Sequence, residues 1–454
     1  MDFSSGIICV CLTWLLIQAL HAFSRSKAIP KKLPPGPKPF PVIGNLLELG
    51  NKPHKSLAKL AKTHGPIMSL KLGQVTTIVI SSAAMSKEIL QTHDQLLSNR
   101  TIPDALRAHK HDEFSLPFIP VSTRWRNLRR ICLEQLFANK ILDVNQDMRH
   151  KKVQDLLADT HQSSLTGESV DIGRAAFKTT LNLLSNTMFS VDLADPNSDR
   201  ARVFKEIVWN IMKEVGRPNL ADYFPVLKKI DPQGVRRRLT VHFGKMLDLF
   251  DRMINQRLQL RNVSGSNTNN DVLDTLLNIS EENREEMDKT KIERLFLDLF
   301  VAGTDTTSAT LEWAMAELLH NPETMSKAKA ELEQGIVKGN PVQESDIPRL
   351  PYLQAIVKET LRLHPSVPFL VPRKAEADVE ISGYIIPKGS QVLVNAWAIG
   401  RDPKLMGQCR IIYARETFDW KLEDGVKPMD MNMDDKFGIT LQRAYPLIAF
   451  PIPV

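Results

Sequence analysis

The longest apolar pattern in the chain runs from about Ile292 to Leu319, with hydrophobic residues at helical spacing on most sides. A helix that is apolar nearly all round is typical of the interior of a large domain. The pattern therefore predicts one long helix that crosses the core. Its apolar residues are Leu295, Phe296, Leu299 and Phe300 before a short polar stretch, and Leu311, Trp313, Ala314, Met315 and Leu318 after it.

The polar stretch consists of small residues and interrupts this helix at its centre. Ala302 and Gly303 would leave room for a flat group beside the backbone. Asp305, Thr306 and Thr307 bring a carboxylate and two hydroxyls to the same place. In one interpretation the hydroxyls bond to carbonyl groups one turn earlier and the carboxylate caps a nearby loop. In the other, the carboxylate and hydroxyls serve catalysis, and this stretch alone does not decide between the two.

Other patterns predict a small amount of β-structure. A hairpin is expected near the start of the domain and a three-stranded meander near residue 385, because short β-branched runs alternate there with glycine turns. The strands are Met68–Leu72, Thr76–Ser81, Val379–Ile381, Tyr384–Pro387 and Gln391–Val394. Helical patterns fill most of the chain between hairpin and meander. The fold is thus expected to be mainly α-helical with small β-sheets.

Two further helices are predicted after the central one. Asn321 is expected to cap the first, with Pro322 at its first position, and the second spans Tyr352–Leu363. Glu359 and Arg362 lie three residues apart in this second helix, which allows an ion pair on one face. In an otherwise apolar helix we expect that pair to be buried and structural.

The N-terminal run Gly6–Phe23 is apolar and, at about 1.5 Å per residue, just long enough to cross a bilayer. One acidic residue precedes it and basic residues follow it, so the positive-inside rule places the rest of the chain in the cytosol. We therefore expect a transmembrane anchor at 1–23, a basic, proline-rich hinge at 24–45 and the main domain at 46–454. A cleaved signal peptide is the alternative, but it normally starts with basic residues, which this run lacks.

Composition agrees with an ordinary globular domain, since 43% of the 454 residues are hydrophobic and 24% are charged. The net charge of +7 comes from scattered basic residues without a nucleic-acid-binding motif, which favours anionic lipid or an acidic protein as partner over nucleic acid. The four cysteines, Cys9, Cys11, Cys132 and Cys409, have neither metal-ligand nor disulfide spacing. That argues for a reducing compartment.

Three side chains are candidates for binding an anion. Trp125 and Arg129 are four residues apart, so a helix would place them on one face. They would offer an indole N–H and a guanidinium to one anion, although an isolated arginine is more often solvated. Arg373 lies on the approach to the predicted meander.

In their order and spacing, these motifs resemble the cytochrome P-450 family of the microsomal plant type. The matching parts are the N-terminal anchor, Pro34–Pro37, Trp125 with Arg129, Ala302–Thr307, Lys358–Arg362 and the meander, over residues 1 to about 404. The segments Phe418–Gly425 and Phe437–Thr440 are similar to the group that hydroxylates geraniol and related monoterpenols. The resemblance implies the cytochrome P-450 fold, haem as cofactor, and the NADPH-cytochrome P-450 reductase as partner.

The same resemblance implies a role for each candidate residue. Trp125, Arg129 and Arg373 would bind haem propionates. Ala302 and Gly303 would let the haem plane approach the central helix. Thr306 would hydrogen-bond the bound dioxygen, Asp305 would relay protons, and Glu359 with Arg362 would belong to a buried ion-pair network that fixes the loop carrying the metal ligand.

The resemblance also implies where substrate and protein are found. A small apolar substrate would lie in a pocket bordered by the loop Arg100–Phe118, the helix near Val301, the segment after Pro365 and the turn near Phe437. The protein would be anchored in the endoplasmic reticulum membrane by a single pass, with its main domain cytoplasmic.

One part of the family pattern is missing. In the family a cysteine thiolate holds the iron, in a loop that reads Phe, two residues, Gly, one residue, Arg, one residue, Cys, one residue, Gly. Counting back from Cys409 puts Asp402, Leu405 and Gly407 at the first three positions, and Ile411 takes the last. We therefore expect several dozen residues, and with them the thiolate ligand, to be absent between about 404 and 418.

Three hypotheses remain open at this point. The chain is a haem-dependent monooxygenase known here in an incomplete form, a haem-free relative of the same fold that is inert or binds a terpenoid or a partner, or a helical membrane protein without a cofactor. The last would make the ordered motifs a coincidence. For this polypeptide we expect no thiolate-bound haem and no turnover.

Overall fold

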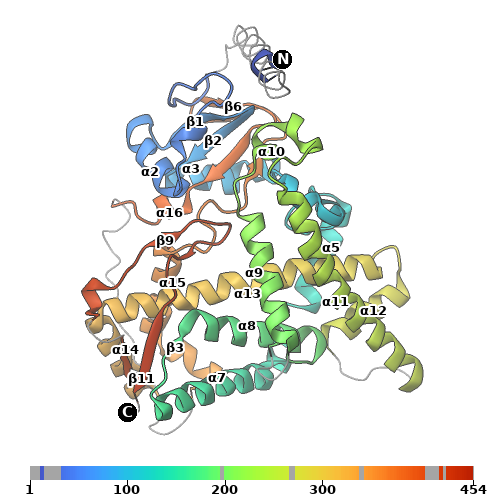
Figure 1. Ribbon diagram of the computed structural model, residues 1–454, viewed down its shortest axis with the longest axis vertical. Coiled ribbons are helices and arrows are strands. Elements are labelled where there is room, and N and C mark those ends of the chain that lie inside the picture. The colour runs from blue at the N-terminus through green and yellow to red at the C-terminus, as the bar shows by residue number, and fades with distance from the viewer. Residues whose placement is uncertain are drawn as a thin grey trace, which may run out of the picture. The chain divides into compact units, whose positions relative to one another are not determined.

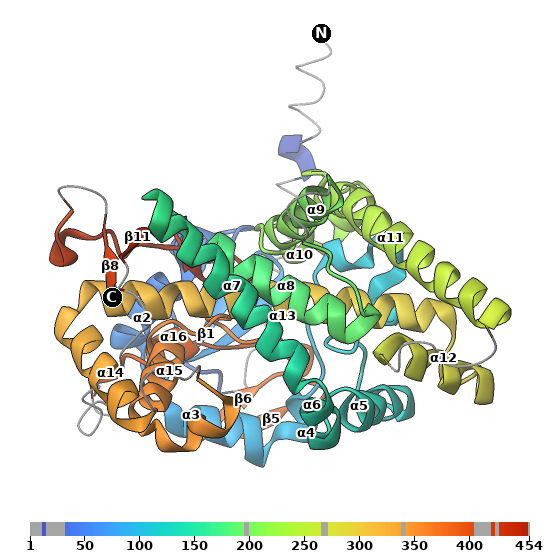
Figure 2. The same ribbon diagram turned by 90° about the horizontal axis from the view of Figure 1, so that it is seen from below.

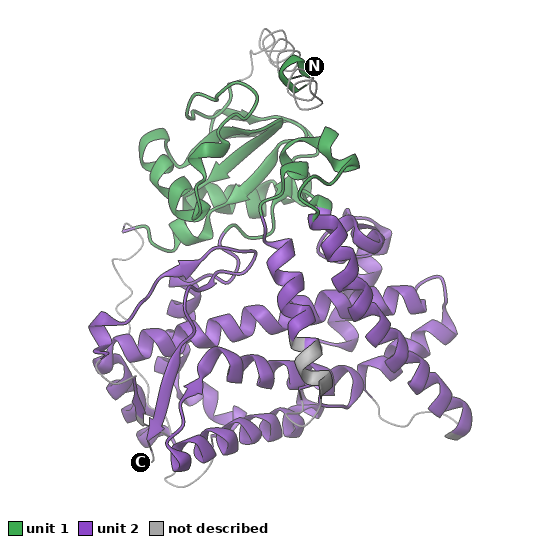
Figure 3. Ribbon diagram, viewed as in Figure 1, with its two compact units in different colours: residues 1–104, 218–234, 369–402 green, residues 105–217, 235–368, 403–454 purple. Residues whose placement is uncertain are grey.

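The computed structural model describes residues 11–14, 32–194, 199–264, 271–336, 342–403, 419–422 and 426–452. They fall into two compact units, each assembled from several stretches of the chain (Figure 3). The first comprises residues 1–104, 218–234 and 369–402, and the second residues 105–217, 235–368 and 403–454. No helix within the described ranges is both long and apolar enough to span a membrane. Most of the predicted anchor lies outside those ranges.

The first unit is built on a four-stranded sheet with short helices (Figure 1). The predicted hairpin is confirmed, because β1 and β2 pair antiparallel with Ile67 opposite Ile80. The strands of the unit are β1 (Ile67–Leu72), β2 (Val75–Ile80), β4 (Arg373–Lys374), β5 (Val379–Ile381), β6 (Tyr384–Ile386) and β7 (Gln391–Val394). Its helices are η1 (Leu46–Glu48), α2 (Pro53–His64), α3 (Ala83–Lys87), η2 (Glu88–Thr92), α4 (Asp94–Leu97), α10 (Leu220–Tyr223), η4 (Pro225–Lys229) and α16 (Ala396–Ile399).

The predicted three-stranded meander is wrong. β5 and β6 pair with each other, whereas β7 lies parallel to β2 and antiparallel to β4, giving the order β1-β2-β7-β4. Val392 and Val394 of β7 are buried in one apolar cluster with Ile78 and Ile80 of the hairpin. Burial against the hairpin, rather than nearness in sequence, therefore chooses the partner of β7.

The proline-rich segment that was expected to be a hinge lies against β1 in its described part. The Ser69 N–H donates to the carbonyl of Pro35 at 2.9 Å, and the Ser69 hydroxyl donates to that of Pro34 at 2.7 Å. A Cβ on Gly36 would lie 1.9 Å from the Ser69 carbonyl oxygen. From Pro34 on, the segment is thus part of the folded unit rather than a free spacer.

We expect Gly36→Ala to lower the free energy of unfolding by about 1–3 kcal/mol, because the added methyl group overlaps a backbone oxygen that cannot move alone. Chemical denaturation measures this difference in the free energy of unfolding. Gly335→Ala is the matched control: an added Cβ there would lie 3.1 Å from the end of a flexible leucine side chain and 3.8 Å from the Arg349 carbonyl oxygen, and alanine favours the helix. Equal stability of the two variants would show that Gly36 is not tightly packed.

The second unit is a bundle of long helices around α13 (Lys289–His320), which confirms the predicted central helix. α13 packs along α8, and α7 follows on the far side of α8 (Figures 1 and 2). Asp288 begins the helix by accepting a hydrogen bond from the Lys291 N–H at 2.9 Å. The buried rings of Phe189, Phe296 and Phe300 pack together in its first half, with Phe189 and Phe296 centroids 4.7 Å apart.

The remaining helices and strands of this unit are short or pack around α13, α8 and α7. The helices are η3 (Asp104–Glu113, from residue 105), α5 (Thr123–Gln135), α6 (Asn139–Val144), α7 (Gln146–Thr166), α8 (Ile172–Phe189), α9 (Asp199–Val215), α11 (Val235–Ser264), α12 (Val272–Glu282), α14 (Pro322–Gly335), η5 (Glu344–Arg349), α15 (Pro351–Leu363) and η7 (Pro428–Asp430). The strands are β3 (Val170–Asp171), β8 (Asp419–Lys421), β9 (Asp435–Lys436), β10 (Gln442–Arg443) and β11 (Ile448–Ile452).

Helices α14 and α15 begin and end close to the predicted positions, with Pro322 at the first turn of α14. The predicted side-chain cap is wrong. The Asn321 amide donates backwards to the Glu317 carbonyl at 2.9 Å, and its side chain caps no N–H of α14. The helix start thus depends on the proline, whose missing N–H needs no partner there.

Three apolar side chains of α13 and α15 are more open than their sequence pattern predicts. Leu311 was expected to be buried but is 47% exposed, as are Val357 and Leu361 on α15. The two helices pack against each other through a separate cluster that includes Leu318 and Ile356. Their outer sides therefore expose apolar side chains where the sequence pattern predicted burial.

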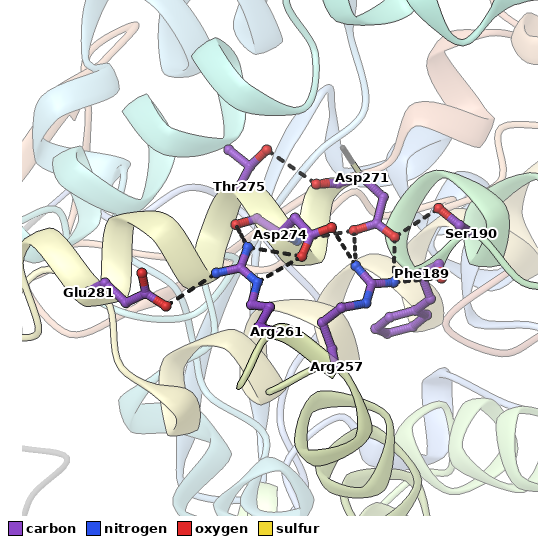
Figure 4. A network of polar contacts seen from close by, with 8 residues as sticks. All are labelled: Phe189, Ser190, Arg257, Arg261, Asp271, Asp274, Thr275 and Glu281. Atoms are coloured by element: carbon purple, nitrogen blue, oxygen red, sulfur yellow. Dashed lines mark hydrogen bonds and ion pairs between the residues drawn. The ribbon is translucent and has the colours of Figure 1, made fainter. Parts of the chain in front are cut away.

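A buried ion network joins α11, α12 and the end of α8 (Figure 4). Arg257 of α11 donates to Asp271 at 2.8 Å and to Asp274 at 2.7 Å, and also to the Phe189 carbonyl at 3.1 Å. Arg261 pairs with Asp274 one turn further along. The network fixes these helices to one another, and nothing in the sequence pattern had indicated it.

Candidate active site

The polar stretch of α13 has a buried side and an open side. Asp305 is only 5% exposed, whereas Ala302 and Thr307 are exposed and Thr306 is half-buried. Ala302 and Thr306 are four residues apart, so they share one side of the helix. The helix thus presents a small residue and a hydroxyl on its open side and keeps its carboxylate inside.

The Thr306 hydroxyl donates to the Ala302 carbonyl one turn earlier, at 2.6 Å. Thr304, Ser308 and Thr310 make the same kind of bond. The back-bonding interpretation is therefore confirmed for Thr306. A hydroxyl that donates in this way still has lone pairs that can accept, so a role toward a ligand on the open side stays a prediction.

Asp305 is held by the C-terminal hairpin, in which β9 and β10 pair antiparallel. Its Oδ1 accepts a hydrogen bond from Gln442 Nε2 at 2.7 Å, while its Oδ2 has no hydrogen-bond partner among the described residues. Burial raises the pKa of Asp305, and the nearby polar groups of Thr440 and Gln442 only partly oppose this. The Thr440 hydroxyl faces the carboxylate without meeting hydrogen-bond geometry. A carboxyl group with a raised pKa is suited to donate a proton near neutral pH.

The hairpin is itself fixed to α13 and to the segment after α15. The fully buried Trp313 donates its indole N–H to the Leu441 carbonyl at 3.1 Å, and the Leu441 N–H donates to the Ser366 carbonyl at 2.8 Å. The Trp313 ring stacks on His364 with centroids 3.8 Å apart. Sequence reasoning missed Gln442, because no local pattern shows that a residue 137 positions away meets Asp305.

Gly303 lies against α8 and not on the open side. A Cβ at this position would lie 2.8 Å from Leu184 Cδ1. The glycine therefore lets the Leu184 side chain of α8 pack directly against the backbone of α13. The predicted role of Gly303 and Ala302 in admitting a haem plane stays a prediction.

Trp125 and Arg129 share one face of α5, as predicted. The Arg129 guanidinium lies 5.3 Å from the centroid of the Trp125 ring, which fits a cation–π contact. The indole N–H of Trp125 donates to the Leu116 carbonyl at 3.2 Å, so this donor already has an acceptor. Arg129 is exposed. Binding of a propionate by this pair stays a prediction, and Arg129 is the better placed of the two.

Arg373 belongs to the first unit and lies at the end of its sheet. Its Nη1 donates to Asp94 Oδ1 at 2.9 Å and to the Leu97 carbonyl at 3.1 Å. Arg100 pairs with it along the backbone, and burial together with the Arg373 charge lowers the pKa of Arg100. Two neighbouring guanidinium groups favour a nearby anion. The propionate role of Arg373 stays a prediction.

Glu359 and Arg362 form the ion pair expected in α15. The arginine Nε and Nη2 bind the two carboxylate oxygens of Glu359 in a forked arrangement. Glu359 is buried as predicted, but Arg362 is half-buried. The pair therefore lies at the edge of the interior, where a further partner can reach the arginine.

Comparison with known proteins now adds to this geometry. The sequence pattern of the cytochrome P-450 family matches residues 34–406. The chain belongs to the cytochrome P-450 family. It is 52% identical to a geraniol 8-hydroxylase of Swertia mussotii over 100% of this chain and 99% of the relative. A geraniol 8-hydroxylase of Catharanthus roseus is 51% identical over 99% of both chains, and a drimenol monooxygenase of Persicaria hydropiper is 45% identical over 100% of this chain and 98% of the relative.

These comparisons support the absence of an internal segment. The alignment with the Swertia enzyme spans 497 positions, so at least 43 of them have no residue in this 454-residue chain. The family match ends at residue 406, close to where the cysteine loop was expected. The exposed Leu311, Val357 and Leu361 fit the loss of residues that would cover α13 and α15.

The cytochrome P-450 family implies haem with a thiolate ligand, and the described residues do not fit that group. Cys132 is buried in α5, and burial, with a smaller contribution from the Asp298 charge, raises the pKa of its thiol to about 11. This cysteine lies within a helix and not in a loop of the family's ligand pattern. Cys11 lies in the N-terminal segment, and no cluster of three metal-ligating side chains occurs in the described ranges. Cys9 and Cys409 are outside them.

Proposed function

We propose that this chain is a monoterpenol-hydroxylase type of cytochrome P-450, whose family reaction is the monooxygenation of a small apolar plant alcohol such as geraniol. The observation that carries the proposal is the 52% identity to a geraniol 8-hydroxylase over the whole chain. The protein would be anchored in the endoplasmic reticulum membrane by residues 1–23 and would receive electrons from the NADPH-cytochrome P-450 reductase. The buried Asp305, whose pKa is raised by burial, and the open face at Ala302 and Thr306 support it.

A second candidate concerns this polypeptide itself: a haem-free member that keeps the terpenol site but does not turn over. It is favoured by the absence of at least 43 aligned positions and by the place of the buried Cys132 within helix α5 rather than in a ligand loop. In this reading, the side chains of α13 and its neighbours still form a pocket for an apolar ligand, and no oxidation follows.

One comparison tests both readings. The chain as given is expressed with haem supply, reduced and exposed to carbon monoxide. A second chain carries the corresponding segment of the Swertia enzyme inserted between residues 404 and 418. We expect a thiolate-type Soret band and geraniol hydroxylation with reductase from the second chain only. Such a band from the first chain would refute the haem-free reading, and a restored chain that shows the band but oxidises no monoterpenol would refute the substrate class.

A further inference from the structure

A strained kink lies in the segment that was predicted to border the substrate. His109 and Lys110 have φ values of 50° and 55°, in the left-handed region. This backbone conformation is unfavourable for residues that carry a Cβ. Two such residues in succession keep it only where contacts with neighbouring residues hold them. Neither residue is a glycine, so the kink depends on what surrounds it.

Three donors from the residues after this kink meet one carboxylate of the central helix. Asp298 Oδ1 accepts from the Ser115 hydroxyl at 2.7 Å and from His111 Nε2 at 3.0 Å. Its Oδ2 accepts from the Leu116 N–H at 2.8 Å. The side chains of Asp298 and His111 are both nearly buried. A carboxylate that accepts several hydrogen bonds in the interior is a strong and directional anchor.

The neighbours of this anchor hold the same segment from other sides. The His111 ring packs edge-on against Phe243 of α11 with centroids 5.0 Å apart, and His109 Nε2 contacts the Thr240 carbonyl at 2.9 Å. The Leu116 carbonyl accepts the indole N–H of Trp125. α5, α11 and α13 thus all bind residues 109–116, and Asp298 supplies the largest share of the polar contacts.

We propose that Asp298 is a positioning residue that latches residues 109–116 onto the central helix and thereby shapes the terpenol pocket. The latch itself follows from contacts within the second unit, and its effect on a ligand rests on the proposed function. Asp298 lies eight residues before Thr306, about two turns along the same helix, so the latch joins the pocket wall to the helix that carries the candidate active site.

The first test measures local opening of residues 109–116. Hydrogen exchange of this segment and tryptic cleavage after the exposed Lys110 are compared in the wild type, Asp298→Ala and Asp298→Asn. We expect at least tenfold faster cleavage in Asp298→Ala and an intermediate rate in Asp298→Asn, because the amide keeps one acceptor. Asp288→Ala is the matched control, since it removes a carboxylate that caps the same helix and that bonds to Lys291 of that helix instead of to residues 109–116.

Cleavage of Asp298→Ala no faster than that of Asp288→Ala would overturn the latch. Should Asp298→Ala fail to fold, Ser115→Ala replaces it, because it removes a single donor, and its rate should lie between wild type and Asp298→Asn. A Ser115→Ala rate equal to wild type would then also contradict the latch.

The second test measures geraniol binding to the folded protein by calorimetry, which needs no turnover. We expect at least fivefold weaker binding in Asp298→Ala than in wild type and unchanged binding in Asp288→Ala. Equal binding by Asp298→Ala and wild type would refute the effect on the pocket. If the wild type binds no monoterpenol at all, the haem-free, terpenol-binding candidate fails while the exchange result still decides the latch.

Discussion

Arg257→Ala is expected to lower the free energy of unfolding by about 3–5 kcal/mol, which is comparable with much of the stability of a whole domain. The guanidinium is 6% exposed and pairs with Asp271 and Asp274, whose side chains are 3% and 1% exposed. Burial lowers the pKa of Arg257, but the bonds and charges of the two carboxylates more than reverse this, so its pKa is raised. Without the arginine, the two buried carboxylates of Asp271 and Asp274 face each other, and Arg261 pairs with Asp274 alone of these two.

The predicted loss of stability is large because the ion network is buried. Urea denaturation measures the free energy of unfolding of each variant. Arg130→Ala is the control, because Arg130 pairs with Glu286 at a position where more than half of its side chain is exposed. Such exposed pairs contribute at most about 1 kcal/mol. Replacing Arg257, Asp271 and Asp274 together by apolar residues of similar volume should lower the free energy of unfolding far less than Arg257→Ala alone. Equal losses in Arg257→Ala and Arg130→Ala would refute the account of the network.

Asp305→Asn is expected to stabilise the protein at neutral pH and to remove part of its pH dependence. Burial raises the pKa of Asp305, so the folded protein binds a proton more tightly than the unfolded chain does. The contribution of Asp305 to stability is therefore present below its ordinary pKa of 3.8 and is lost as pH rises through its folded value. Each unit of that rise corresponds to about 1.4 kcal/mol.

The measurement is the difference in free energy of unfolding between Asp305→Asn and wild type from below pH 3.8, the ordinary pKa of the carboxyl group, up to about pH 8. We expect this difference to grow in favour of the variant as pH rises, and then to level off. Glu312 also has a pKa raised by burial, but it is present in both proteins, so most of its effect cancels. Gln442→Ala should enlarge the pH dependence, because it removes the hydrogen bond to Asp305. Parallel curves for Asp305→Asn and wild type would show that Asp305 is not desolvated.

Local patterns predicted the elements whose burial follows directly from spacing. The central helix from Ile292 to Leu319, the first hairpin and the helix starts predicted at Pro322 and Tyr352 agree with the structure within a few residues. Periodicity and proline chemistry act over a few residues, so they can be read from a single chain. The same holds for Trp125 and Arg129, whose separation of four residues fixes a shared helix face.

Other features depend on contacts between distant segments, which no local pattern contains. β7 joined β2 instead of β6 because its valines complete the apolar cluster of the hairpin. The buried Arg257 network was invisible for the same reason. Asp298 carried a signal that could have been used, since a carboxylate within the apolar run Leu295–Phe300 needs partners, but the partners themselves, 183 and 187 positions away, could not be named.

The sequence by itself determined the helical core, the family, and the lack of a cysteine loop near residue 409, because motifs and their spacing are properties of the linear chain. The tertiary structure alone decided that Gln442 holds Asp305, that the Trp125 indole donates to Leu116, and that Leu311 is left uncovered. The physical reason is that hydrogen-bond partners and burial are set by which surfaces meet once the chain is compact, and spacing along the chain does not fix which surfaces those are.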